Sequence, residues 1–288
     1  MLEAATLGVL TGGVYALMAS GLTLIFGVMR IVSVAQGALV LLGAYLSLVL
    51  LRDWHVDPFV GLAVTVPVMF LLGIAIEVVF IRPLQIDREA LSVLVTWALA
   101  LGVEGFLGYL FTTDYQQLDV PYEAAAVAVG GLHLTYVSLL GFGLCLGILG
   151  ALFGILYRTT FGAAVRAAML DRSAAALVGI DVRRVSAVAF GIGTATAAAG
   201  GAVFGISTAF HPASHYDLIT RLLAIVVLGG LGSLRGAIVA AVLMLVVDDV
   251  ASVLISPTWA EFVFFVVLVL VLIWRPTGLF GDSSRGGT

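Results

Sequence analysis

The chain has 288 residues, of which 62% are apolar and only 10% are charged. Such a composition lies outside the range of soluble globular domains and indicates a polytopic membrane protein. The formal net charge is −4 and the chain contains no lysine. A nucleic-acid partner is therefore excluded, because phosphate binding needs clustered basic side chains on an exposed face.

Long apolar runs follow one another along the chain. A helix needs about 20 apolar residues to cross the hydrocarbon core of a bilayer. Six runs satisfy this requirement: residues 4–29, 31–51, 59–81, 90–112, 137–157 and 185–210. Three further segments lie at 222–234, 237–255 and 259–275, and the first of these is short and interrupted by glycines. The sequence therefore predicts an all-α, polytopic transmembrane protein with eight or nine membrane segments, some short or discontinuous, in a single domain over residues 1–288.

The arginines are divided unevenly between the two sides that nine crossings imply. With the N-terminus outside, eleven of them face the cytoplasm: Arg30, Arg82, Arg88, Arg158, Arg166, Arg172, Arg183, Arg184, Arg235, Arg275 and Arg285. Only Arg52 and Arg221 then lie outside, which agrees with the positive-inside rule. The same topology predicts a polar external loop at 113–134 and a cytoplasmic tail at 276–288. If 222–234 is re-entrant instead, the C-terminus moves outside and the bias weakens.

Small residues recur at every fourth position within several spans. The stripes are Gly193, Ala197, Gly201 and Gly205; Gly143, Gly147 and Ala151; and Gly12, Ala16 and Ser20. This spacing places each set on one face of a helix and lets neighbouring helix backbones approach closely. Static packing and sliding between packed helices both remain open.

The most informative segment is the loop at 158–184, which carries five arginines between two spans. Residues 162–179 predict a short amphipathic helix, with Gly162 at its start, an alanine-rich body, and Gly179 at the position of a C-cap. The body also holds Leu170, Leu177 and Val178, which a solvated loop does not need. We therefore favour a surface for a soluble partner over a loop that only satisfies the charge rule.

Ionisable and polar groups within apolar runs are costly and often functional. Glu77 lies close to Arg82 at the inner boundary, so an interfacial ion pair is expected there. The candidates for a solute path are Gln36, Thr96, Trp97, Glu104 and Asp248. The neighbouring carboxylates of Asp248 and Asp249 cannot share one helix face, so at most one should line a cavity. Structural hydrogen bonding between helices is the alternative for each candidate.

The sequence offers no catalytic or metal-binding set. The four histidines (His55, His133, His211 and His215) fall in predicted external loops. His211 and His215 have the spacing of metal ligands on a helix, but Pro212 between them disfavours a regular helix there. The glycine-rich run 229–236 lacks the lysine of a phosphate-binding loop and follows an apolar span, so we interpret it as a tight membrane turn. We expect no enzyme activity and no ATP binding in this chain.

Five stretches carry a resemblance that runs nearly end to end. They are GLTLIFGVMRIVSVAQGALVLLGAYLS (21–47), IRPL (81–84), RAAMLDRSAAALVGIDVRRV (166–185), VVLGGLGSLRGAIVAA (226–241) and RPTGLFG (275–281). On these stretches the chain resembles the shorter permease subunits of branched-chain amino acid ABC importers. The resemblance implies a second related permease, two cytoplasmic ATPase subunits that bind ATP and Mg²⁺, and an extracytoplasmic solute-binding protein. It also implies the bacterial plasma (inner) membrane.

The resemblance further implies a role for the loop at 158–184 as the segment that couples the permease to the ATPases. The positions assigned to this coupling are Gly162, Arg166, Asp171, Arg172, Ala175 and Gly179. Two departures from the family pattern, residues 33–38 and Glu104, leave the solute open between branched-chain amino acids and urea, short amides or other small solutes. Two rival functions are a passive channel and a proton-coupled secondary carrier, the latter with Glu104 or Asp248 as the proton site.

Overall fold

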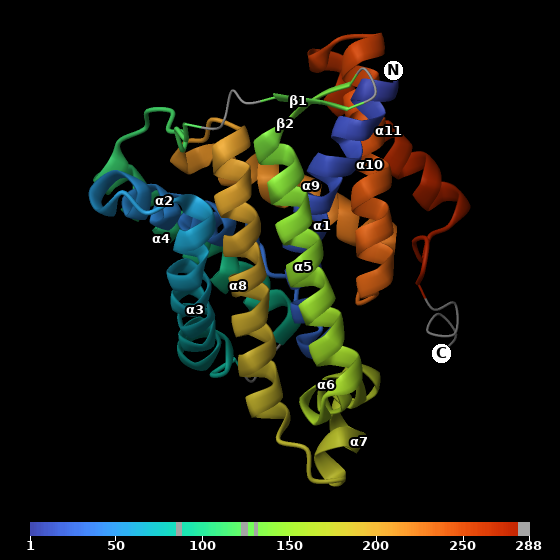
Figure 1. Ribbon diagram of the computed structural model, residues 1–288. Helices are drawn as coiled ribbons and strands as arrows, with labels where there is room; N and C mark the ends of the chain where they lie inside the picture. The colour runs from blue at the N-terminus through green and yellow to red at the C-terminus, as the bar shows by residue number, and fades with distance from the viewer. Residues whose placement is uncertain (85–87, 122–125, 130–131, 282–288) are drawn as a thin grey trace.

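The computed structural model describes residues 1–84, 88–121, 126–129 and 132–281. Over these residues the chain is a bundle of helices with one short β-hairpin (Figure 1), which confirms the all-helical prediction. The elements are α1 (Leu2–Met29), α2 (Gln36–Trp54), α3 (Pro58–Ile76) with a π-helical turn η1 (Glu77–Ile81), α4 (Arg88–Phe111), β1 (Ala126–Val129), β2 (Leu132–Thr135), α5 (Tyr136–Arg158), α6 (Thr160–Leu170), α7 (Arg172–Leu177), α8 (Val182–Ser207), a 3₁₀ turn η2 (Pro212–Ser214), α9 (His215–Gly229), α10 (Leu234–Leu254) and α11 (Pro257–Trp274).

Eight helices in the described part of the chain are long and apolar enough to cross a membrane. They are α1, α2, α3 with η1, α4, α5, α8, α10 and α11. The most apolar stretches of α8 and α1 are 83% and 78% buried, whereas those of α4 and α11 are 22% and 11% buried. The helices α1 and α8 therefore form the centre of the bundle, and α4 and α11 lie at its surface.

The short helix α9 packs against α10 and α2 within the bundle. Gly8 of α1 faces Val246 of α10 and Gly12 faces Val242, so α10 runs antiparallel to α1 and starts where α1 ends. Because α9 directly precedes α10, it also reaches that end. Its 15 residues span only about 22 Å. The start of α9 lies beside the start of α2, where a Cβ atom on Gly37 would lie 2.5 Å from the carbonyl of His215. His211, four residues earlier, lines a cavity with Thr11 of α1, and its ring contacts the Tyr115 ring at 4.7 Å.

The bounds predicted for this segment, 222–234, are wrong. The helix begins at His215, and residues 230–233 form the turn into α10, with Gly230 and Gly232 at positive φ values of 96° and 84°. The hydropathy pattern missed the first half because Asp217 and Arg221 interrupt it. Arg221, which the sequence placed in an external loop, lies within α9.

The second predicted span, 31–51, is discontinuous. Residues 31–35 are not helical, yet Ile31, Ser33 and Ala35 are buried, and α2 begins only at Gln36. The side-chain amide of Gln36 donates to the carbonyl of Gly193, close to the middle of α8, at 3.0 Å. The break therefore lies deep in the bundle, where non-helical backbone is tolerated only when protein covers it.

Glycine stripes of two kinds line the helices. A Cβ atom on Gly43 of α2 would lie 2.4 Å from the Cα atom of Ala198, and one on Gly201 of α8 would lie 2.1 Å from the carbonyl of Val40. The α8 stripe is thus in tight backbone contact with α2. Gly143 and Gly147 of α5, in contrast, would meet no atom within 4 Å. Identical spacing in the sequence therefore serves packing in one helix and leaves an open face in the other.

The described part of the segment predicted as a polar external loop, 113–134, includes both strands of the hairpin and a buried connection to α8. Within it β1 pairs with β2 in antiparallel register, with Ala126 opposite Thr135. Before the hairpin, the backbone amide of Leu118 donates to the carbonyl of Gly205 at 3.0 Å, and Leu118 is fully buried. This part of the segment closes the end of α8. Residues 122–125 and 130–131 of the predicted loop, and 282–288 of the predicted tail, lie outside the described residues.

Candidate coupling surface and solute path

The segment after α5 turns sharply and forms α6. The hydroxyl of Thr159 caps α6 by accepting the Gly162 amide at 3.0 Å. A Cβ atom on Gly162 would lie 2.2 Å from the carbonyl of Leu156, so only glycine fits this turn. Gly162 therefore lies in the first turn of α6, where it allows α6 to fold back against the end of α5.

The single helix predicted over 162–179 is wrong in one respect, because the chain breaks at Asp171. This residue has extended backbone angles (φ −150°, ψ 115°), and its carboxylate caps α7 by accepting the amides of Ser173 and Ala174 at 2.8 and 3.1 Å. These hydrogen bonds, from Ala174 and then from Ser173, lower the pKa of Asp171. The loop ends at Gly179, whose φ of 86° suits the C-cap position predicted for it.

The arginines assigned to coupling bind the bundle itself. Arg166 donates to the carbonyl of Leu156 and lies over the Tyr157 ring, with Cζ 5.4 Å from its centroid. Arg172 donates to the carbonyl of Met29 at 3.2 Å and to the hydroxyl of Ser186 at 3.3 Å. These two side chains tie the loop to the ends of α1, α5 and α8.

The outward surface of the loop is apolar. Leu170, Leu177 and Val178 are 70%, 88% and 76% exposed, whereas Ala175 is buried against the rest of the loop. We call the three exposed side chains the loop's apolar surface. Figure 1 shows α6 and α7 projecting from the end of the bundle opposite the N-terminus.

Two of the solute-path candidates have structural roles. Thr96 of α4 is fully buried, and its hydroxyl accepts the amide of Val34 at 3.2 Å while donating to the carbonyl of Ser92 at 2.8 Å. Gln36 is likewise buried and binds α8 as described above. Both residues hold the non-helical segment before α2 in place.

Trp97 and Glu104 of α4 instead both contact Tyr216 of α9, and His215 of the same helix lies beside Glu104. The sequence suggested His215 only as a metal ligand and did not single out Tyr216. The Tyr216 hydroxyl donates to Glu104 at 3.1 Å, and the Tyr216 ring lies 5.8 Å from the Trp97 ring. His215 Nε2 lies 3.8 Å from the same carboxylate, while its Nδ1 is bonded to the Pro212 carbonyl at 3.1 Å. We call Trp97, Glu104, His215 and Tyr216 the α4–α9 cluster.

Asp248 is engaged in an ion pair. Its carboxylate binds Arg221 of α9 at 2.8 Å, and the two side chains are 13% and 22% exposed. The neighbouring Asp249 accepts the hydroxyl of Thr11 at 3.3 Å and lines a cavity of about 410 Å³ between α1, α8, α9 and α10. As predicted, only one of the adjacent carboxylates lines the cavity, but it is Asp249.

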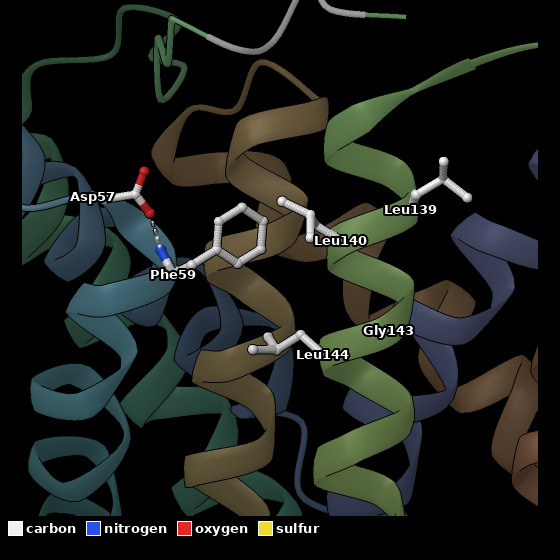
Figure 2. A pocket seen from close by; sticks show the side chains of 6 residues that line it. All are labelled: Asp57, Phe59, Leu139, Leu140, Gly143 and Leu144. Atoms are coloured by element: carbon white, nitrogen blue, oxygen red, sulfur yellow. Dashed lines mark hydrogen bonds between the residues drawn. The ribbon is translucent and has the colours of Figure 1, made fainter. Parts of the chain in front are cut away.

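Two further features carry no solute chemistry. The expected pair between Glu77 and Arg82 is confirmed, with 3.2 Å between Oε2 and Nη2, and Glu77 is buried within η1. A groove of about 500 Å³ lies between the start of α3 and α5 and is lined by Asp57, Phe59, Leu139, Leu140, Gly143 and Leu144. Figure 2 shows how these six residues are placed. The carboxylate among them, Asp57, caps α3 by accepting the Phe59 amide at 2.9 Å, so the groove offers mainly apolar surface.

Comparison with known proteins identifies the family. Residues 5–272 match the family described as the permease component of branched-chain amino acid transport systems. The chain belongs to this family. It is a multi-pass membrane permease, a transport subunit rather than an enzyme.

Several relatives match over nearly their whole length. The permease is 26% identical to the high-affinity branched-chain amino acid transport permease BraD of Pseudomonas aeruginosa, over 95% of this chain and 94% of BraD. It is also 26% identical to LivH of Escherichia coli K12, over 95% and 93% of the two chains. A shorter region of 129 residues, 43% of this chain and 29% of the relative, is 33% identical to LivM of the same organism. No solved structure matches the chain.

Proposed function

We propose that the permease is one of two related permease subunits of an ATP-driven importer, and that α6 and α7 dock on its cytoplasmic ATPase subunits. The observation that carries this proposal is the loop's apolar surface, which projects beyond the candidate membrane spans. Burial of apolar surface stabilises an interface by about 25 cal/mol per Å². A partner that covers Leu170, Leu177 and Val178 therefore removes their apolar surface from water, which favours docking.

The arginine contacts explain how docking would be transmitted. Arg172 connects the loop to α1 and α8, and Arg166 connects it to α5. Because α1 and α8 form the buried centre, a displacement of the loop reaches the helices that hold the bundle together. ATP and Mg²⁺ bind to the ATPase chains in this proposal, and this chain supplies only the mechanical contact.

The proposed orientation has the N-terminus outside and the C-terminus in the cytoplasm of a bacterial inner membrane. The arginine distribution supports it. Arg221 lies within α9 and no longer counts as an external charge, so Arg52 is the only external arginine that the sequence count leaves. The solute-binding protein would then dock at the N-terminal end, where residues 113–121 and 211–217 lie.

The α4–α9 cluster supports an amino acid as the solute. Glu104 keeps 27% of its side chain exposed on a helix that is mostly uncovered, and a carboxylate facing hydrocarbon costs about 2.5–3.5 kcal/mol. A water-filled path beside the second permease removes this cost. There the Glu104 carboxylate and the Trp97 ring offer an α-ammonium group an ion pair and a cation–π contact. The names of the relatives indicate leucine, isoleucine and valine as the first solutes to test.

Docking is tested by a charge placed in the loop's apolar surface. Leu177→Asp should reduce co-purification of the ATPase subunits at least about tenfold, because an aspartate at a covered apolar site must be desolvated. Ser173→Asp is the matched control, since it adds the same charge to an exposed polar position of α7. If the Leu177 variant retains its ATPases as well as the control does, the docking surface lies elsewhere.

Orientation and transport class are tested separately. The single cysteine, Cys145, is fully buried, so new cysteines can be labelled against a silent background. An impermeant maleimide should label Trp54→Cys in intact spheroplasts and Leu177→Cys only after lysis.

In proteoliposomes, accumulation of the solute should require ATP and the binding protein. Equilibration without ATP would instead identify a channel, and uptake that collapses with the proton gradient would identify a secondary carrier.

A further inference from the structure

A large cavity lies at the end of the bundle that carries α6. It shares Arg166 and Leu170 with the coupling segment described above, and none of its lining residues belongs to the α4–α9 cluster. Its volume is about 1400 Å³, and it lies between the end of α1, the start of α4, the α5–α6 turn, the α9–α10 turn and Gly281. We call it the inner cavity. Pockets for small organic ligands measure about 300–1,000 Å³, so this one accommodates a larger molecule.

Three arginines from three different helices line the inner cavity. Arg30 follows the last residue of α1, Arg166 belongs to α6, and Arg235 lies in the first turn of α10. Arg166 and Arg235 both lie over the Tyr157 ring, each with Cζ 5.4 Å from its centroid. Among the described residues, no carboxylate lies within ion-pair distance of any of the three.

Their surroundings add to the unbalanced positive charge. The N-terminal end of a helix carries a partial positive charge, so the position of Arg235 at the start of α10 is unfavourable without an anion. The charge of Arg30 reaches Asp171, but the carboxylate of Asp171 is occupied in capping α7. In the described part of the chain, Arg82, Arg184 and Arg221 each pair with a carboxylate, which sets the cavity arginines apart.

The remaining wall of the inner cavity is largely apolar. Phe26, Leu156, Met169, Leu231 and Phe280 contribute to it. A small inorganic anion would use the arginines and leave this wall uncovered. A ligand with one anionic group and apolar chains matches both parts.

We propose that the inner cavity binds an anionic phospholipid of the inner leaflet, with its phosphate held by Arg30, Arg166 and Arg235 and its acyl chains along the apolar wall. Basic pockets between membrane helices on the cytoplasmic side suit such headgroups. The proposal uses the orientation given under the proposed function but not the identity of the solute, and the cysteine labelling tests that orientation independently. A lipid in this position touches α1, α6 and α10 at once.

Native mass spectrometry of the assembled, delipidated transporter tests this site. Dioleoylphosphatidylglycerol should bind more tightly than dioleoylphosphatidylcholine, which has the same chains and no net charge. Arg30→Gln and Arg235→Gln should each weaken phosphatidylglycerol binding about fivefold, the value of one basic side chain near an anionic headgroup. Arg184→Gln is the matched control, because it removes a charge from the same end of the molecule outside the cavity. Glycerol 3-phosphate, the headgroup without chains, should compete poorly.

Four results would overturn the proposal. They are equal binding of the two lipids, equal weakening by Arg184→Gln, effective competition by glycerol 3-phosphate, and exclusion of the lipid from the assembled transporter. The third would make the cavity a simple anion site, and the last would assign the arginines to a contact with the ATPases. Thermal unfolding of each variant verifies its fold, and Arg235→Gln provides the safer test because it relieves the unfavourable charge at the start of α10.

Discussion

The ion pair between Arg221 and Asp248 allows a structural role for Asp248 to be separated from a role in the solute path. Both side chains are largely buried, and 2.8 Å separates Nη1 from Oδ2. Breaking a buried pair by removing one partner costs about 3–5 kcal/mol, because the other charge is left uncompensated. Arg221 keeps 22% exposure toward a cavity. We therefore expect the lower end, about 3 kcal/mol, or on the order of a hundredfold in the unfolding equilibrium.

The two single variants should differ in cost. Arg221→Met leaves Asp248 and Asp249 side by side with no cation, and so should show the full loss. Asp248→Asn leaves Arg221 in the same cavity as Asp249, which can compensate the charge, so its loss should be smaller. The double variant Arg221→Met/Asp248→Leu removes both charges and should recover most of the stability, because a hydrophobic pair of similar volume often replaces a buried ion pair without loss.

Denaturant titration of the purified transporter, followed by tryptophan fluorescence, measures these stabilities, and uptake in proteoliposomes is measured alongside. If Asp248 has a structural role, the double variant should transport solute as well as the parent. Stable protein with lost uptake would instead place Asp248 in the solute path. Equal destabilisation of the two single variants would show that Asp249 does not compensate Arg221.

Three further predictions follow from the packing and the polar contacts. Gly43→Ala should destabilise the permease by about 1–3 kcal/mol, because its Cβ atom would lie 2.4 Å from the Cα atom of Ala198. In the same titration, Gly147→Ala on the open face of α5 should be neutral or should stabilise the permease by up to about 1 kcal/mol. Glu104→Gln should raise the KM for leucine about tenfold if the carboxylate holds the ammonium group. Tyr216→Phe is the control variant, and a KM of Glu104→Gln that is unchanged would remove Glu104 from the path. Asp171→Ala should speed hydrogen exchange at the amides of Ser173 and Ala174, whereas Asp171→Asn should retain their protection. Because hydrogen bonds lower the pKa of Asp171, the stability that this cap contributes is present above the unfolded pKa and is lost only as pH falls through the lower folded pKa. Protection that already declines near pH 6 would contradict the assignment.

Hydropathy and turn chemistry were sufficient for much of the fold. The long apolar runs correspond to helices because the bilayer sets one length scale for all of them. Gly179 was recognised as a helix end because a positive φ is a local requirement of the C-cap. The pair between Glu77 and Arg82 could also be inferred, since its members are five residues apart.

The features that the sequence did not reveal depend on contacts between distant residues. Arg221 is tolerated within α9 because Asp248 lies opposite it on α10, and a hydropathy window registers only the charge. The break at 31–35 is apolar apart from Ser33, and the Thr96 hydroxyl of α4 provides the partner for the backbone amide of Val34. Likewise, spacing alone cannot show which glycine stripe has a neighbouring helix.

Two of the stretches that carry the family resemblance are parts of one structure. The carbonyls of Leu228 and Gly229, at the end of α9, would lack partners in the bundle, and the amides of Leu279 and Phe280 donate to them at 2.7 and 3.2 Å. A Cβ atom on Gly278 would lie 2.7 Å from the backbone nitrogen of Gly230, so the two segments can approach this closely only because residue 278 is a glycine. The segment after α11 thus completes the hydrogen bonding of a helix whose last two residues are buried, where unpaired carbonyls are costly. It thereby fixes the α9–α10 turn, and with it Arg235, at the wall of the inner cavity.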